Sequence, residues 1–273
     1  MSSYGNNFTV EGGTNVTHSW SITAKAVTVK VKDTAVTYGD TPSFTVDETE
    51  LLSGDHLTGT AQYACGYDAA DPAHRTVGSY DVTVSGLSNP NYDVTFAKGT
   101  LTVNAKAIDL RVNNATVTYG EPAPAFSVDE SVLVAGDSLS GTAVYTTAYI
   151  PGDATYGVVG SYAVSFTGLS NSNYVITRKK GVLTVERATR AIVTVSVADV
   201  EEGHAVAPSV TSAIEEEGDT TVTYLYGVSG SSDAPTETPP TEAGSYYVIA
   251  RLSASHNYLE AQSGPCQFTV YSE

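Results

Sequence analysis

The chain has 273 residues, of which 30 are acidic and 13 basic, so its formal net charge is -17 at pH 7. Apolar residues make up 41% of the sequence, an ordinary share for a folded protein, which excludes a wholly disordered chain. The acidic balance argues against nucleic acid or an anionic membrane surface as a partner, because both repel a protein of this charge. No apolar run approaches the length of a membrane span, so direct membrane insertion is not expected.

Residues 1–24 are expected to be the closing strands of a preceding repeat. Trp20-Ser21-Ile22-Thr23 stands before Ala24-Lys25 much as Leu101-Thr102-Val103-Asn104 stands before Ala105-Lys106. The opening residues have neither the basic region nor the apolar core of a secretory signal. We therefore interpret the sequence as a segment of a longer chain.

Residues 25–105 form the first of two long repeats. Valines alternate with polar residues over 27–31, and the same period of two returns over 80–84. Such alternation turns one face of a strand inward. Turn signals rich in Gly, Asn, Asp and Pro separate these runs. A single short helical turn is expected over 47–52, and its counterpart in the next repeat over 129–134.

Residues 106–187, the second repeat, match the first in order at an offset of 81 and then 82 residues. The matched segments are Val36-Thr37-Tyr38-Gly39 with Val117-Thr118-Tyr119-Gly120, Gly78-Ser79-Tyr80 with Gly160-Ser161-Tyr162, Asn91-Tyr92 with Asn173-Tyr174, and Gly99-Thr100-Leu101-Thr102-Val103 with Gly181-Val182-Leu183-Thr184-Val185. So many ordered matches at one spacing indicate a tandem duplication.

Residues 188–273 form a divergent third repeat. Ala243-Gly244-Ser245-Tyr246 and His256-Asn257-Tyr258 match the later part of the first two repeats, but the Tyr-Gly pair is absent. Strands are expected over 193–197 and 246–252, where apolar residues alternate.

The three repeats predict an all-β fold. Each repeat is long enough to bury its own core, unlike the shorter repeats that share a continuous one. We expect an elongated tandem array of small β-sandwich or Ig-like domains, with a β-grasp-like fold as the alternative. Short linkers are expected at 104–106 and 186–190.

The two long repeats resemble the MBG-type domains of the YGX subtype, which occur in tandem in bacterial cell-surface and secreted proteins. The residues that carry this resemblance are Thr37-Tyr38-Gly39-Asp40, Gly78-Ser79-Tyr80, Asn91-Tyr92 and Gly99-Thr100-Leu101-Thr102-Val103, with their counterparts in the second repeat. The third repeat resembles a divergent MBG-like or bacterial Ig-like module. The resemblance implies an extracellular stalk or adhesin at the cell surface or secreted. It carries over no catalytic or ligand-binding residue, since these motifs are typical of folding determinants.

Sequence signals of an enzyme are missing. The chain contains no His-Glu-x-x-His, Gly-x-Ser-x-Gly, phosphate-binding loop or dinucleotide-binding fingerprint, and its five histidines occupy no repeated position. We therefore expect no catalytic residue and no organic cofactor.

Acidic residues of the third repeat are the candidates for a metal site. They are Asp199, Glu201, Glu202, Glu215, Glu216, Glu217 and Asp219. Clustered carboxylates suit Ca²⁺, which takes six to eight oxygen ligands. Against this, the spacing of a calcium loop is absent, and runs of charge usually form solvated faces. Calcium is kept as an alternative to having no cofactor.

Aromatic residues in one loop of each long repeat are the candidates for ligand binding. They are Tyr149 and Tyr156, in the loop 145–156, and Tyr67 in the corresponding loop of the first repeat. Exposed aromatic rings of this kind can stack on sugars.

The sequence favours a non-enzymatic extracellular segment that acts as the stalk or spacer of an adhesin, as a monomeric rod. An alternative is an adhesin module whose partner is a host glycan or a matrix or mucin protein, with avidity raised by repetition. A second alternative is a set of accessory domains of a larger surface enzyme.

Overall fold

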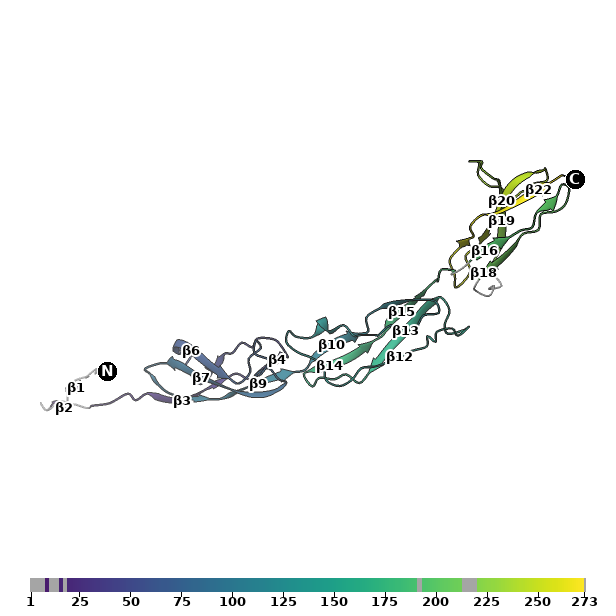
Figure 1. Ribbon diagram of the computed structural model, residues 1–273. Helices are drawn as coiled ribbons and strands as arrows, with labels where there is room; N and C mark the ends of the chain where they lie inside the picture. Colours follow the sequence, from purple (N-terminus) through teal and green to yellow (C-terminus); the bar gives the residue numbers. More distant parts are fainter. Residues whose placement is uncertain (1–7, 10–14, 17–18, 191–192, 213–219, 273) are drawn as a thin grey trace. The chain divides into compact units, whose positions relative to one another are not determined.

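The structure, a computed structural model, describes residues 8–9, 15–16, 19–190, 193–212 and 220–272 (Figure 1). Within these residues the regular structure consists of strands and one 3-10 turn, η1 (Glu130–Val132), at a position where the sequence predicts a helical turn. The predicted all-β, tandem class is confirmed. The described part of the chain contains no helix long and apolar enough to cross a membrane. Strands β1 (Phe8–Thr9) and β2 (Asn15–Val16) pair antiparallel.

The chain divides into two compact units, and the division runs through the second repeat. The first unit holds the residues up to Ile108 together with Leu133–Ser140 and Ser170–Ile176. The second unit holds Asp109–Val132, Gly141–Leu169 and the residues from Thr177 onward. Two segments of the second repeat therefore pack with the first repeat.

Two sheets build the first repeat. Its strands are β3 (Lys25–Val31), β4 (Thr34–Thr37), β5 (Val46–Asp47), β6 (Thr58–Cys65), β7 (Gly78–Ser88), β8 (Tyr92–Ala97) and β9 (Gly99–Asn104). One sheet has the order β5-β3-β8 and the other β4-β9-β7-β6. Strand β3 leads into β4, and β8 leads into β9. These two segments therefore cross together from one sheet to the other and pair in parallel in both, as β3/β8 and β4/β9.

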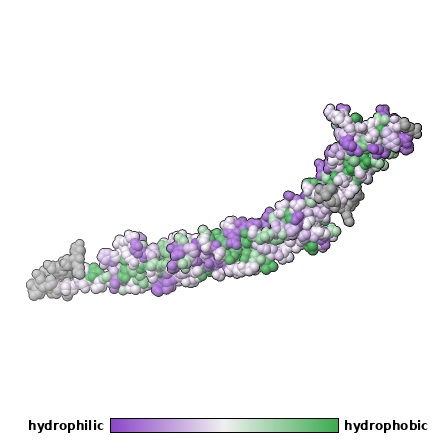
Figure 2. Space-filling view, in the orientation of Figure 1, coloured by the Kyte–Doolittle hydropathy of each residue, from purple (hydrophilic) through white to green (hydrophobic). Residues whose placement is uncertain are grey.

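The core of the first repeat lies between these sheets. Val27, Val29 and Val31 of β3 are buried and alternate with exposed residues, as the sequence predicts. Leu101 and Val103 of β9 are buried in the same way. Strand β3 contacts both β7 and β9, so the repeat is a β-sandwich. The alternation also leaves polar and apolar residues interspersed over the face drawn in Figure 2.

A glycine is required where β8 passes into β9. A Cβ atom on Gly99 would lie 2.3 Å from the carbonyl oxygen of Val31, a backbone atom that cannot easily move. The same approach recurs in the second repeat, where a Cβ on Gly181 would lie 2.5 Å from the carbonyl oxygen of Val112. The glycine that opens this motif is therefore a determinant of the fold.

The second repeat has the same strand order as the first, except that an isolated bridge between Val112 and Val128 stands in place of β5. Its strands are β10 (Lys106–Arg111), β11 (Ala115–Thr118), β12 (Val144–Thr147), β13 (Gly160–Thr167), β14 (Tyr174–Lys179) and β15 (Gly181–Glu186). One sheet pairs β10 with β14, and the other has the order β11-β15-β13-β12.

The third repeat keeps the larger of these two sheets. Its strands are β16 (Val193–Ser196), β17 (Val200–Glu201), β18 (Ser209–Ser212), β19 (Val222–Val228), β20 (Gly244–Leu252), β21 (Ala261–Gln262) and β22 (Cys266–Tyr271). The order β17-β22-β20-β19 repeats that of β4-β9-β7-β6, including the parallel first pair. The third repeat thus shares this sheet order with the first two, and its assignment as a divergent repeat stays a prediction.

Candidate functional site

Of the three tyrosines predicted as ligand candidates, two are buried. Tyr67 and Tyr149 are each 5% exposed. The Tyr67 hydroxyl accepts a hydrogen bond from the amide of Gly39 at 3.1 Å, and the Tyr149 hydroxyl donates to the carbonyl of Glu121 at 2.6 Å. Both rings therefore support the Tyr-Gly turns from inside, and the expectation of exposed rings is wrong for them. Tyr156 is 51% exposed and stays a prediction.

The acidic residues considered for calcium are only partly covered by the structure. Four lie outside the described residues: Glu215, Glu216, Glu217 and Asp219. Asp199 accepts a hydrogen bond from the amide of Thr269 at 2.6 Å, and Glu201 lies 3.9 Å from the ring of His204. In the part of the chain that is described, no three His, Cys, Asp or Glu residues are grouped to hold a metal ion.

Glu202 and Gly203 occupy the position of the Tyr-Gly pair in the third repeat. The Glu202 amide donates to the carbonyl of Tyr271 at 2.8 Å, as the Tyr38 amide donates to Asn104 at 2.8 Å. Gly203 has a φ of 84°, like the glycines of the other turns. Comparison of the repeats by sequence misses this equivalence because glutamate replaces the tyrosine. The signal that could have shown it is Gly203, which closely follows the end of a strand as Gly39 does.

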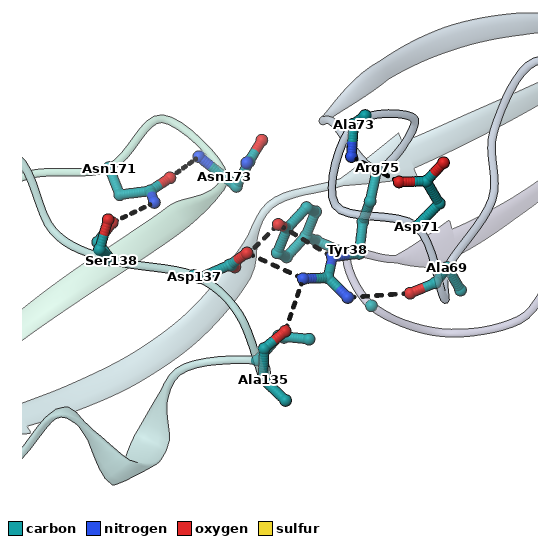
Figure 3. A network of polar contacts seen from close by, with 12 residues as sticks. Tyr38, Ala69, Asp71, Ala73, Arg75, Ala135, Asp137, Ser138, Asn171 and Asn173 are labelled. Carbon is teal, nitrogen blue, oxygen red and sulfur yellow. Dashed lines mark hydrogen bonds and ion pairs between the residues drawn. The ribbon is translucent and has the colours of Figure 1, made fainter.

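Side chains from the two long repeats converge within the first unit at one buried cluster, here called the joint: Tyr38, Arg75, Asp137 and Tyr174. Arg75 and Asp137 form an ion pair at 2.9 Å, and their side chains are only 4% and 8% exposed (Figure 3). The Tyr38 hydroxyl donates to Asp137 at 2.8 Å, and the Tyr174 hydroxyl also donates to this carboxylate. The two tyrosine rings meet edge to face with centroids 5.3 Å apart.

All three nitrogen atoms of the buried Arg75 guanidinium donate hydrogen bonds. Its Nη atoms donate at 2.9 Å to the carbonyl groups of Ala69 and Ala135, and its Nε donates at 3.2 Å to the Tyr38 hydroxyl (Figure 3). The same guanidinium lies 5.5 Å from the centroid of the Tyr38 ring. Satisfying the donors in this way offsets the cost of removing the charge from water.

Family motif residues complete the joint. The amide of Val77, just before the Gly-Ser-Tyr motif, donates at 3.0 Å to Oδ1 of Asn173 from the Asn-Tyr motif. Val134 packs on Gly39, where a Cβ would lie 2.9 Å from Val134 Cγ2 and where φ is 89°. The sequence predicts these motifs to be folding determinants within each repeat, and the structure shows that they also join one repeat to the next.

Electrostatics at the joint favour an ionised carboxylate between neutral phenols. Burial opposes the charge of Asp137, but hydrogen bonds from Tyr174, Tyr38 and Arg75 outweigh it and hold its pKa below the usual range. Burial and the hydrogen bond to Asp137 raise the pKa of Tyr174, and the same two causes raise the pKa of Tyr38. Near neutral pH, Asp137 is therefore ionised, and Tyr38 and Tyr174 keep their protons.

These shifts predict a pH dependence of stability. Folding lowers the pKa of Asp137. Its contribution to stability is therefore fully present above the pKa of the unfolded chain, about 3.9, and is lost as the pH falls through the pKa of the folded chain. Because the pKa of Tyr174 is raised, its contribution is present below about pH 10 and is lost as the pH rises further. We expect Tyr174→Phe to reduce the alkaline loss of stability by up to about 1.4 kcal/mol per pH unit.

Urea unfolding of the whole chain between about pH 8 and 11.5, a range that brackets the ordinary tyrosine pKa, measures the alkaline slope. The matched control is Tyr271→Phe, since Tyr271 is 50% exposed and lies in the third repeat. Equal alkaline slopes for Tyr174→Phe and the unaltered chain would contradict the assignment.

A second set of similar contacts lies within the second unit. The rings of Tyr119 and Tyr258 meet edge to face at 5.3 Å, as those of the joint do. The amide of Val159 donates at 2.9 Å to Oδ1 of Asn257. Here the cation comes from Arg190, which is 8% exposed and lies 5.2 Å from the Tyr258 ring. The edge-to-face tyrosine pair and the amide-to-asparagine contact thus recur in the chain.

Comparison with known proteins identifies the two long repeats. The family model described as "MBG domain (YGX type)" matches residues 27–102 and 108–184, together more than half of the chain. A search of curated proteins gives no match. Among solved structures, the crystal structure of Drosophila N-cadherin EC1-3 aligns over 92% of this chain and 98% of its own, at 9% identity and a TM-score of 0.23, which is too low to carry an argument.

Proposed function

Because the chain belongs to the family of MBG domains of the YGX type, we propose that it is a spacer in the stalk of a bacterial surface adhesin. MBG domains are typical of extracellular surface proteins, and such repeats are typical of non-catalytic modules. In this proposal the chain lies outside the cell, has no enzymatic activity and is a monomer that separates a functional domain from its anchor.

The joint is the observation that carries the proposal. A spacer has to keep neighbouring repeats in a fixed register when its ends are pulled. The Arg75–Asp137 pair does this because only one placement of the two repeats lets the Asp137 carboxylate accept from Arg75, Tyr38 and Tyr174 together. The motif residues of the family serve this joint, which is what a structural module requires of them.

Strand order within each repeat adds a second argument. The pairs β3/β8 and β4/β9 are parallel, so the strand that enters a repeat and the strand that leaves it run in the same direction. A pull along the chain then loads their hydrogen bonds in shear, and several bonds have to break together. This arrangement suits a module that carries tension.

The proposal predicts that the chain has no receptor of its own. We expect the purified chain to show no saturable binding to an array of glycans, mucins and matrix proteins. A saturable hit would overturn the spacer role in favour of a glycan- or host-protein-binding module. In that case Tyr156→Ala, with the half-exposed Tyr271→Ala as its control, decides whether the predicted loop is the site.

A further inference from the structure

The second repeat contributes one half of the joint. The first repeat carries equivalent residues of its own next to the start of β3. We call the four residues Leu52, Asp55, Asn91 and Tyr92 the docking face. Each stands 82 residues before a residue of the second repeat that contacts the first: Val134, Asp137, Asn173 and Tyr174.

Matching hydrogen bonds hold the docking face and its counterpart. The Tyr92 hydroxyl donates to Asp55 at 2.5 Å and accepts from the Leu52 amide at 2.9 Å. The Tyr174 hydroxyl likewise donates to Asp137 and accepts a backbone amide at 2.8 Å. The carboxylate, the phenol and the apolar residue are therefore presented in the same arrangement at both places.

Exposure distinguishes the two faces. Leu52 is 63% exposed, whereas its counterpart Val134 is partly buried against Gly39. Ile22 is 84% exposed and, with Leu52, Asp55 and the rest of the docking face, lines a shallow hollow. An apolar side chain, an acceptor carboxylate and a carboxamide thus stand together at the surface.

The residues just before the first repeat point to the same occupant. Trp20 and Ile22 are 58% and 84% exposed, while Leu101 and Val103, which stand 81 residues later, are 0% and 2% exposed in the closing strand β9. Large apolar side chains at alternate positions fit a strand that completes a sheet. The segment that leads into the docking face is therefore patterned as the closing strand of a repeat.

We propose that the docking face binds the end of another MBG repeat that carries a Tyr-Gly turn and an arginine, as the first repeat does. Asp55 then receives a guanidinium, as Asp137 receives Arg75. Leu52 packs on the glycine of the turn, and Asn91 accepts a backbone amide. The inference deepens the proposed function, since it takes the chain as one link in a row of repeats.

Charge argues against a second copy of this chain as the occupant. At the end of the third repeat the position of Tyr38 is taken by Glu202, which is exposed. Its carboxylate would face that of Asp55, and like charges across an interface repel. The occupant is therefore a repeat of the first kind, and we expect the full chain alone to sediment as a monomer.

The test extends the full chain by replacing residues 1–24 with a second copy of residues 25–105, so that an end of the required kind precedes the docking face. The sequence contains one tryptophan, Trp20, which the replacement removes. A Phe44→Trp substitution in the added copy then reports the unfolding of that copy by fluorescence. Three further variants carry Asp55→Asn in the original first repeat, Arg75→Met in the added copy, or both.

We expect the two substitutions to be coupled by about tenfold or more in the unfolding equilibrium constant of the added copy. Asp55→Asn in the chain without the added copy is the control for effects inside the first repeat. Coupling below about twofold would overturn the proposal, and so would an added copy that fails to fold, because the same sequence folds against the second repeat. The binding array is unaffected by either result, so the spacer role and the docking face can fail separately.

Discussion

Replacing Asp137 by alanine is expected to lower the free energy of unfolding of the first unit by about 3 to 5 kcal/mol. The substitution leaves the guanidinium of Arg75, which is 4% exposed, without its counter-charge. It also removes the acceptor of the Tyr38 and Tyr174 hydroxyls. A buried charge without its counter-charge and two buried hydroxyl protons without an acceptor are each costly, so the loss should exceed that of any surface ion pair.

Urea unfolding of the full chain, followed by circular dichroism, measures the effect. The matched control is Asp81→Ala, which removes an ion pair with Lys98 of the same length, 2.9 Å, but with side chains 69% and 64% exposed. We expect this control to change stability by less than about 1 kcal/mol. Similar losses for Asp137→Ala and Asp81→Ala would show that the joint is not closed in solution.

Alanine at Gly99 is expected to destabilise the first repeat by about 3 kcal/mol, the upper end of the range for overpacking. The added methyl group would meet the carbonyl oxygen of Val31 at 2.3 Å, and that oxygen belongs to a strand held on both sides. Relief would require β3 to move away from the crossing, which would break the parallel pairs that connect the two sheets.

Thermal unfolding of the full chain distinguishes this clash from the general effect of replacing a glycine. The control is Gly264→Ala, because a Cβ at Gly264 would meet no atom within 4 Å and its φ is outside the left-handed region. We expect a clear drop in melting temperature for Gly99→Ala and little change for the control. Equal melting temperatures would mean that the crossing is loose enough to admit a methyl group.

Much of the fold is predictable from sequence because period-two alternation is a local signal. Val27, Val29 and Val31 are buried as their spacing predicts, and the repeated motifs by themselves indicate the family that the comparison identifies. Local patterns also mark the 3-10 turn at Glu130–Val132. Each of these features depends on residues close together in the chain.

Features that depend on contacts between repeats are not predictable in the same way. Arg75 has Gly157 at the matching position of the second repeat, so no repeated pattern points to it. Its partner Asp137 lies 62 residues away and belongs to a different repeat. The prediction for Tyr67 is wrong for a related reason, since a tyrosine in a polar loop gives no sign that its ring is turned inward.

Native-state hydrogen exchange at the amide of Val77 in the full chain tests most directly whether the joint holds the first two repeats together. This amide has as its acceptor Oδ1 of Asn173, in the second repeat, so its protection reports the joint and not the sheet of its own repeat. We predict protection comparable to that of amides in β7, and its loss in Asp137→Ala while β7 stays protected. Exchange of Val77 as fast as that of an exposed loop amide in the unaltered chain would contradict the joint and the spacer role built on it.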